Sequence, residues 1–287
     1  MNAKVLEGTK VAEDIDKKLV GRIKTLRLKD VVPTLAILRV GERAEDISYE
    51  IGATKRAESV GIAVKKIVFP TEVSQDELQD AVRTVNANDD IHGLLMFRPL
   101  PDHIDEELVV DALAVQKDVD SSTKASLASV FTGSAAGFAP CTAQACIEIL
   151  DHYRIDIEGK NIVVVGRSLV VGKPVAQMLL NRNATVTMAH SRTKNLPEIT
   201  KASDIIITCV GRAHMLDKNY FSSGQTVIDV GINLLNNQIV GDAVFDEVSN
   251  IVDAITPVPR GVGSVTTSVL CKHVVEAAEA AKAVGAD

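Results

Sequence analysis

Short runs of Val, Ile, Leu and Ala alternate along the chain with longer stretches in which apolar residues recur every three or four positions. The short runs favour buried strands, and the longer stretches favour amphipathic helices. The predicted strands are 35–40, 64–69, 93–96, 161–165, 185–188, 205–210, 226–230 and 251–255. The predicted helices are 8–28, 45–59, 75–85, 105–114, 143–152, 172–181 and 265–283. This alternation is typical of βαβ units, so we expect an α/β fold built on parallel sheets.

At 287 residues the chain is long enough for two domains, each with its own core. The helix predicted at 143–152 is followed by a polar turn and a new strand, which places the domain boundary just before it. We predict that residues 1–142 form the first domain and residues 143–265 the second. The final helix, within 266–287, is Ala-rich and amphipathic, and we expect it to return to the first domain.

The composition is that of a folded, mildly acidic protein, with 46% hydrophobic and 24% charged residues and a net charge of -7. This charge argues against a nucleic-acid groove, because binding phosphates requires clustered Lys and Arg. No apolar run is long enough to cross a membrane, and residues 1–4 lack the apolar stretch of a signal peptide. We therefore expect a cytoplasmic protein with neither nucleic-acid nor membrane partners.

The cysteines at 141, 146, 209 and 271 show neither C-x-x-C pairing nor a histidine at metal-ligand spacing. We expect Cys141, Cys146, Cys209 and Cys271 to be reduced packing residues, and we predict no metal site.

A strand, a glycine-containing turn and a helix start follow one another in the second domain. Gly166, Arg167 and Ser168 follow the strand, and Val171 and Gly172 open the helix. This order suits a dinucleotide pyrophosphate, which needs a tight turn, a close backbone approach and free N–H groups at a helix N-terminus. The strict G-x-G-x-x-G spacing is absent, so an ordinary βα turn is the alternative interpretation.

Two later strands of the second domain end in glycine, at Gly211 and at Gly231, which precedes Ile232. Bare backbone at the carboxyl ends of parallel strands lets a cofactor lie close to the sheet. We therefore predict that residues 143–265 form a Rossmann-type dinucleotide-binding domain.

The end of the second strand of this domain bears on which dinucleotide binds. An NAD site usually offers a carboxylate there, whereas this strand ends in His190, Ser191 and Arg192. Arg167, Ser191 and Arg192 instead supply cationic and hydroxyl donors suited to a 2′-phosphate. The sequence favours NADP over NAD, although Arg192 alone would also fit a solvated loop charge.

Several further motifs occur in a fixed order from about Leu6 to the final helix. They are Tyr49, Lys117-Asp118-Val119-Asp120, Pro140-Cys141-Thr142, Val230-Gly231-Ile232-Asn233, Val240-Gly241-Asp242 and a stretch from Thr256-Pro257-Val258-Pro259 to Gly261-Val262-Gly263. In these motifs the chain resembles the methylenetetrahydrofolate dehydrogenase/methenyltetrahydrofolate cyclohydrolase family of folate one-carbon metabolism. The resemblance implies a homodimer of two-domain α/β chains, with a folate-binding catalytic domain followed by a Rossmann domain that binds NADP.

The resemblance also assigns roles to individual residues. It implies that Tyr49 and Asp120 bind the folate and serve catalysis, with Asp120 accepting N–H groups of the pterin edge. Pro259 and Gly261 would line the substrate pocket, together with Phe97. Nucleotide binding would fall to Gly166, Arg167, Ser168, Val171, Gly172, Ser191, Arg192, Gly211, Gly231 and Ile232.

The chain departs from the family pattern around the predicted folate pocket. Where the family has a lysine four residues after the tyrosine, this sequence has Ala53, and Lys55 is predicted to point away from the pocket. Phe97 replaces a glutamine, and Arg98 follows it as a possible replacement cation. Further departures are Asp46 in place of Ser, Ser121 in place of Gly, and Arg260 and Ser264 within the Pro-Gly-Gly-Val-Gly-Pro motif.

The two family reactions depend on different groups. Hydride transfer to a nicotinamide depends on positioning, whereas hydrolysis of the methenyl product needs proton transfer, which Ala53 and Phe97 cannot provide. We therefore predict an NADP-dependent methylenetetrahydrofolate dehydrogenase with weak or absent cyclohydrolase activity. The alternatives are a catalytically silent NADP- or folate-binding paralogue, a dehydrogenase for another one-carbon carrier, and a fully bifunctional enzyme.

Overall fold

The computed structural model describes residues 3–284 and divides into two compact units. Unit 1 contains residues 3–13 and 142–266, and unit 2 contains residues 14–141 and 267–284. The predicted two-domain α/β fold is confirmed. The final helix α10 (Val262–Val284) belongs to unit 2 from residue 267 onward.

Unit 2 is built on a three-stranded parallel sheet. Its strands lie in the order β3-β2-β4, with β2 at Thr34–Val40, β3 at Ala63–Phe69 and β4 at Gly93–Met96. Its other elements are α1 (Gly8–Arg27) from residue 14 onward, α2 (Ala44–Val60), α3 (Gln75–Ala87), α4 (Glu106–Asp111), the 3₁₀ turn η1 (Val115–Lys117) and α5 (Lys124–Thr132).

Local sequence signals set several of these boundaries. Helix α3 begins with a capping box, in which the side chains of Ser74 and Glu77 each accept the other residue's backbone N–H. Helix α2 ends at Gly61, whose φ of 99° is in the left-handed region that glycine adopts without strain. These two signals set the end of α2 and the start of α3, which come before and after β3 in the chain.

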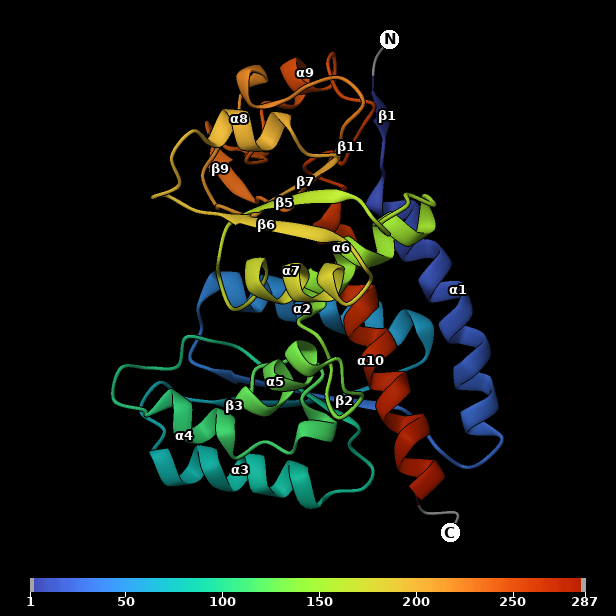
Figure 1. The fold of residues 1–287 in the computed structure, drawn as a ribbon. Helices are drawn as coiled ribbons and strands as arrows, with labels where there is room; N and C mark the ends of the chain where they lie inside the picture. Colours follow the sequence, from blue (N-terminus) through green and yellow to red (C-terminus); the bar gives the residue numbers. More distant parts are fainter. Residues whose placement is uncertain (1–2, 285–287) are drawn as a thin grey trace. The chain divides into compact units, whose positions relative to one another are not determined.

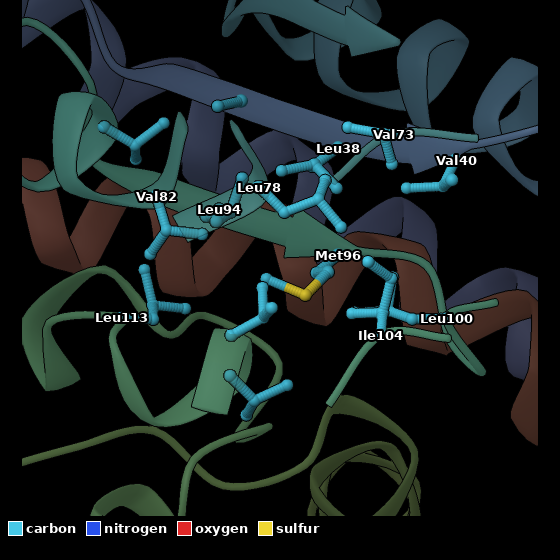
Figure 2. Packing of buried hydrophobic residues seen from close by; sticks show 14 of the residues in the cluster. Leu38, Val40, Val73, Leu78, Val82, Leu94, Met96, Leu100, Ile104 and Leu113 are labelled. Atoms are coloured by element: carbon cyan, nitrogen blue, oxygen red, sulfur yellow. The ribbon is translucent and has the colours of Figure 1, made fainter. Parts of the chain in front are cut away.

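The core of unit 2 lies between the sheet and the helices α3 and α4, which run side by side (Figure 1). Leu38 of β2, Leu78 of α3 and Met96 of β4 are buried in it (Figure 2). The central strand β2 is buried almost throughout because strands and helices cover it on every side. This packing holds the carboxyl ends of β2 and β4 in place.

Unit 1 is built on a six-stranded parallel sheet in the order β1-β11-β8-β7-β5-β6. The strands are β1 (Lys4–Val5), β5 (Asn161–Val165), β6 (Thr185–Ala189), β7 (Ile205–Thr208), β8 (Thr226–Asp229) and β11 (Ala254–Ile255). The helical elements are α6 (Cys141–His152), α7 (Gly172–Leu180), α8 (Leu196–Lys201), η2 (Lys218–Tyr220) and α9 (Phe245–Val248). Strand β5 lies between β6 and β7, so the strand order reverses there, and this is where ligands bind in open α/β sheets.

The first residues differ from the predicted domain division. Residues 1–13 were assigned to the first domain, but residues 3–13 belong to unit 1 with the nucleotide-type sheet. The reason is that β1 pairs in parallel with β11, with Lys4 opposite Ala254. A two-residue strand carries too little periodicity to be read from sequence.

A two-stranded hairpin of unit 1 was also not predicted. Strands β9 (Asn233–Leu235) and β10 (Gln238–Val240) are antiparallel and joined by Asn236 and Asn237, which both have positive φ. Positive φ at both positions is the geometry of a type I′ turn, for which asparagine is favoured. The short helices α5, α8 and α9 were likewise not predicted.

None of the helices within residues 3–284 is long and apolar enough to cross a membrane.

Candidate active site

The turn after β5 can be formed only by glycine at position 166. Gly166 has a φ of 138°, and a Cβ there would lie 2.5 Å from the Cys209 Sγ and 2.6 Å from the Cys209 carbonyl oxygen. At Gly172, a Cβ would lie 2.5 Å from the Gly166 carbonyl oxygen. The two glycines therefore let the turn pack tightly, Gly166 against the loop after β7 and Gly172 against the turn itself, which is the tight turn that the dinucleotide interpretation expects.

Ser168 organises the rest of this turn. Its hydroxyl accepts hydrogen bonds from the backbone N–H groups of Val171, at 3.1 Å, and Gly172, at 3.4 Å. The bonds are within the loop, so they shape the entry into α7 before any ligand is present. Ser168 is itself exposed, which leaves its hydroxyl accessible at the N-terminus of the helix.

The predicted 2′-phosphate residues lie on adjacent strand ends. Val165 is opposite Ala189 in the β5–β6 pairing, and the Gly166 N–H donates to the Ala189 carbonyl oxygen at 2.9 Å. Arg167, Ser191 and Arg192 follow these two ends directly and are exposed. Neither guanidinium pairs with an acidic side chain among the residues described, so both are available to an anion.

A buried carboxylate that was not among the predicted site residues holds the loop after β7. Asp242 is fully buried and accepts hydrogen bonds from the backbone N–H groups of Val210, Gly211 and Arg212 at 2.7, 3.4 and 3.0 Å. The Asn233 amide donates to the same carboxylate at 3.0 Å. Asp242 thereby fixes Gly211, whose φ is 64°, at the end of the sheet. Its place within a Val-Gly-Asp motif was the only sequence signal.

A second buried carboxylate, Asp229, holds the ends of β8 and the hairpin together. It accepts backbone N–H groups from Gly231, Asp242 and Ala243 at 2.9 to 3.1 Å. Burial raises the pKa of Asp229 to about 7, and the charge of Asp242 adds to this rise, while the three N–H donors oppose it. Through these bonds Asp229 fixes the turn after β8.

The loop at 257–264 and the end of β8 enclose a cavity of about 170 Å³ within unit 1. Its lining includes the predicted residues Gly231, Ile232, Pro259 and Gly261. The lining also includes Arg260, which has a φ of 75° and is exposed. A non-glycine residue in this region costs about 1–2 kcal/mol, so the arginine is held there against its backbone preference.

Unit 2 brings together three predicted folate residues. The rings of Tyr49 and Phe97 meet edge to face, with centroids 5.7 Å apart. Burial of its hydroxyl raises the pKa of Tyr49, and the charge of Asp120 raises it further. Tyr49, Phe97 and Asp120 therefore belong to one site, although they come from α2, the end of β4 and the loop before α5.

The surroundings of Asp120 act on the pKa of its carboxyl group in opposite directions. Burial raises the pKa of Asp120, and the nearby charge of Asp118 acts in the same direction. The Cys141 N–H donates to the Asp120 Oδ1 at 3.2 Å, and this bond and the charge of Arg98 both lower the pKa. A ligand that donates N–H groups to this carboxylate would favour its charged form.

The Lys117-Asp118-Val119-Asp120 motif is a structural support for Asp120. The Lys117 Nζ donates to three backbone carbonyl oxygens at the C-terminus of α3, at 2.7 to 3.0 Å. The buried Asp118 accepts the N–H groups of Ser122 and Thr123, each at 2.8 Å. Ser121, which lies between Asp120 and Ser122, has a φ of 56° and is buried.

Residues 53, 55 and 98 decide where positive charge lies in this site. Ala53 is buried on α2, and Lys55 is exposed, as expected for a solvated lysine. That Lys55 does not replace the missing lysine stays a prediction. Arg98 pairs with Glu106 at 3.5 Å, and the other carboxylate oxygen of Glu106 accepts the Leu100 N–H at 2.8 Å. Arg98 is thus close enough to influence Asp120 but is held toward α4.

His273 of α10 supports the same loop and was not predicted. Its Nδ1 lies 2.8 Å from the Val119 carbonyl oxygen and 3.7 Å from the Cys141 Sγ, and its ring stacks on Phe138. A carbonyl oxygen only accepts, so the Nδ1 carries the proton. No sequence signal pointed to it, because a histidine in a long amphipathic helix is usually a packing residue.

The described part of each unit thus carries its own group of predicted residues. Unit 1 gathers the glycine turn, the two arginines and the cavity at the carboxyl edge of its sheet, and unit 2 gathers Tyr49, Phe97, Arg98 and Asp120. The fold and the glycine turn define the class: a two-domain α/β protein with one Rossmann-type, dinucleotide-binding unit.

Comparisons with known proteins define the family more narrowly. The profile of the tetrahydrofolate dehydrogenase/cyclohydrolase catalytic domain matches residues 6–120, and that of the NAD(P)-binding domain of the same enzymes matches residues 140–282. The bifunctional protein FolD of Carboxydothermus hydrogenoformans is 50% identical over 280 residues, which cover 96% of this chain and 98% of that protein.

Solved structures agree with this match. The bifunctional methylenetetrahydrofolate dehydrogenase/cyclohydrolase FolD of Campylobacter jejuni is 36% identical with a TM-score of 0.94, covering 97% of this chain and 99% of that one. The Trypanosoma brucei enzyme, solved with NADP and an inhibitor, is 32% identical with a TM-score of 0.91 and covers 98% of both chains. The chain belongs to the tetrahydrofolate dehydrogenase/cyclohydrolase family. The two solved relatives are named for both activities and the Carboxydothermus protein is named as bifunctional, so these relatives count against the predicted loss of the cyclohydrolase.

Proposed function

We propose that this protein oxidises 5,10-methylenetetrahydrofolate with NADP and hydrolyses the methenyl product, as the names of its relatives indicate. Asp120 carries the proposal, because its half-buried carboxylate lies close enough to raise the pKa of Tyr49 and accepts the Cys141 N–H. The nucleotide-binding part of the proposal is supported by the two domain profiles of one enzyme family, which match residues 6–120 and 140–282.

In the dehydrogenase step, the protein's task is to bind and orient two small molecules. Asp120 would accept the N–H groups of the pterin edge, and the Tyr49 ring would pack against the folate. When bound, the nicotinamide accepts a hydride from the bridging carbon. No side chain has to transfer a proton in this step. The rate enhancement would therefore come from positioning of the two molecules by Asp120 and by the fixed loops at Gly166 and Gly211.

The residues present fit NADP. Gly166 and Gly172 allow the tight turn between β5 and α7. The exposed Ser168 hydroxyl lies at the N-terminus of α7, where it would donate to a phosphate oxygen. Arg167, Ser191 and Arg192 would hold the 2′-phosphate, and the strand end offers no carboxylate that would repel it.

A specific observation favours a second candidate, a dehydrogenase whose cyclohydrolase is weak. Ala53 is buried, Lys55 is exposed, and the Phe97 ring occupies the place beside Tyr49. Neither Ala53 nor Phe97 can move a proton, whereas general acid–base help is typically worth about 10² to 10⁴ in rate. Hydrolysis would then depend on Tyr49, Asp120 or solvent.

Two assays on purified protein separate these functions. Reduction of NADP with 5,10-methylenetetrahydrofolate tests the dehydrogenase, and decay of 5,10-methenyltetrahydrofolate tests the cyclohydrolase. Comparable rates in both assays support the bifunctional enzyme, and nicotinamide reduction with hydrolysis near the uncatalysed rate supports the second candidate. Nucleotide binding without turnover on this or another one-carbon carrier would leave only the silent paralogue.

We also propose that the chain forms a homodimer. Leu234 and Leu235 of the hairpin and the neighbouring Ile232 and Ile239 are exposed, with Leu234 at 74%. Apolar residues gathered on one hairpin favour burial against a second copy. Sedimentation of wild type and Leu234→Asp tests this, and a monomeric wild type would refute it.

A further inference from the structure

We propose that the Ser121 hydroxyl is an additional substrate-binding group, which donates a hydrogen bond to the carbonyl oxygen of the folate pyrimidine ring. This inference rests on the proposed folate function and adds a contact to it. The residue lies directly after Asp120, at a position where the family pattern has glycine.

The backbone at Ser121 is held in an unfavourable conformation by its neighbours. Its φ of 56° is in the left-handed region that a residue with a Cβ rarely adopts. The Ser121 N–H donates to the Asp118 carbonyl oxygen at 3.3 Å, and the Asp118 carboxylate accepts the next two N–H groups. Glycine would adopt this conformation freely, so the side chain is retained despite the strain.

The Ser121 hydroxyl also lacks a partner inside the protein. Ser121 is 5% exposed, and its Oγ has no hydrogen bond among the residues that the structure describes. Buried hydroxyl groups are nearly always hydrogen-bonded, and an unpaired one is destabilising. Strain and an unpaired hydroxyl at the same residue are both accounted for if a ligand supplies the partner.

The chemistry of the folate ring fits this pair of residues. The pyrimidine ring of a tetrahydrofolate carries an amine and a ring N–H beside a carbonyl oxygen. Asp120 offers only acceptors when charged, so it suits the two donors and leaves the carbonyl oxygen without a partner. A hydroxyl on the next residue can donate to that oxygen, which a glycine could not.

Three variants of the full chain test the proposal. Ser121→Ala removes only the hydroxyl, Ser121→Gly also removes the strain, and Ser122→Ala is the matched control because Ser122 contributes only its backbone N–H to Asp118. Binding of tetrahydrofolate is measured by calorimetry, KM for 5,10-methylenetetrahydrofolate and for NADP by steady-state kinetics, and Tm by thermal unfolding.

We expect Ser121→Ala and Ser121→Gly to bind tetrahydrofolate about five- to tenfold more weakly, the effect of losing one neutral hydrogen bond. KM for NADP should be unchanged in both Ser121 variants, and Ser122→Ala should bind tetrahydrofolate as wild type does. The Tm of Ser121→Gly should equal or exceed that of wild type. If both Ser121 variants bind tetrahydrofolate within about twofold of wild type, whatever their Tm, the hydroxyl does not contact the substrate and the proposal is overturned.

The outcome for this inference is separable from that for the proposed function. A wild type that binds tetrahydrofolate but does not reduce NADP would refute the proposed function, while weaker binding by both Ser121 variants would still support the contact. A wild type that does not bind tetrahydrofolate would refute both.

Discussion

Ala53 lies one helical turn after Tyr49 on α2, so the two side chains share a face of the helix. A lysine at position 53 would place its amine on the Tyr49 side, where a proton could be exchanged with the substrate. The alanine is buried, and the Phe97 ring already lies against Tyr49 in an edge-to-face pair. Both positions must therefore change together if the proton-transfer group is to be restored.

The double variant Ala53→Lys/Phe97→Gln distinguishes the two candidate functions. A dehydrogenase with a weak cyclohydrolase should gain at least about tenfold in methenyl hydrolysis relative to the dehydrogenase rate, because acid–base help is worth about 10² to 10⁴. The bifunctional enzyme should show no such gain. Stopped-flow decay of 5,10-methenyltetrahydrofolate measures it, with Tm recorded alongside. Lys55→Ala is the control and should leave both rates unchanged. No gain in a folded double variant would mean that the wild-type site already supplies the proton transfer.

Arg192 is the residue at which NADP selectivity can be tested most directly. We expect Arg192→Ala to raise KM for NADP about tenfold or more and to leave KM for NAD unchanged, because a charge-assisted bond to the 2′-phosphate is lost. Steady-state kinetics with both nucleotides give the ratio.

The matched control for Arg192 is Lys201→Ala, which removes one exposed positive charge at the C-terminal end of α8. Lys201 leads into the amino end of β7, on the opposite edge of the sheet from the phosphate residues. Equal effects of Arg192→Ala and Lys201→Ala would show a general charge effect and contradict a specific phosphate contact.

At the scale of single elements, the turn from β5 into α7 determines nucleotide binding. Gly166→Ala would place a Cβ 2.5 Å from the Cys209 Sγ, so the turn or the β7 loop would have to move. We expect loss of NADP binding and destabilisation by about 1–3 kcal/mol, measured by nucleotide titration and by chemical denaturation.

Gly159 provides the control for this substitution, because its φ is 71° and a Cβ there would meet nothing within 4 Å. Gly159→Ala should therefore show a strain cost of about 1–2 kcal/mol with NADP binding intact. If Gly166→Ala bound NADP as tightly as Gly159→Ala does, the close approach at this turn would not matter for the cofactor.

At the scale of the whole molecule, Asp229 links folding to pH. Its pKa is about 7 in the folded protein against 3.8 for the ordinary side chain, with burial the first cause. Between about pH 4 and 7 the folded state therefore binds a proton that the unfolded state has lost. The unfolding free energy should fall as pH rises through this window, by up to about 1.4 kcal/mol per pH unit from this group, and level off above it.

The variant Asp229→Asn cannot titrate, so its unfolding free energy should lack this contribution. Chemical denaturation of wild type and variant at pH 5, 6, 7 and 8 gives the difference as a function of pH, which is unaffected by any constant cost of the substitution. A difference that does not change between pH 5 and 7 would mean that the three backbone donors keep Asp229 charged.

Much of the fold and of the candidate site followed from the sequence, because the signals were local. The β-branched runs gave the main strands, and residues directly after those strands gave Gly166, Arg167 and Arg192. The motif around Asp120 and the missing lysine at position 53 could also be identified directly from the sequence. The roles expected of the site residues stay predictions, since only binding and kinetic measurements can test them.

The sequence by itself determined the alternation of strands and helices, the two-domain α/β fold and the family, since each depends on short-range pattern and motif order. Only the tertiary structure decided that β1 pairs with β11, that Asp242 holds three loop N–H groups, and that His273 of the last helix supports the Asp120 loop. These contacts join residues far apart in the chain. Their partners are set by the packing of whole elements, and no local pattern encodes which distant backbone group a buried side chain will meet.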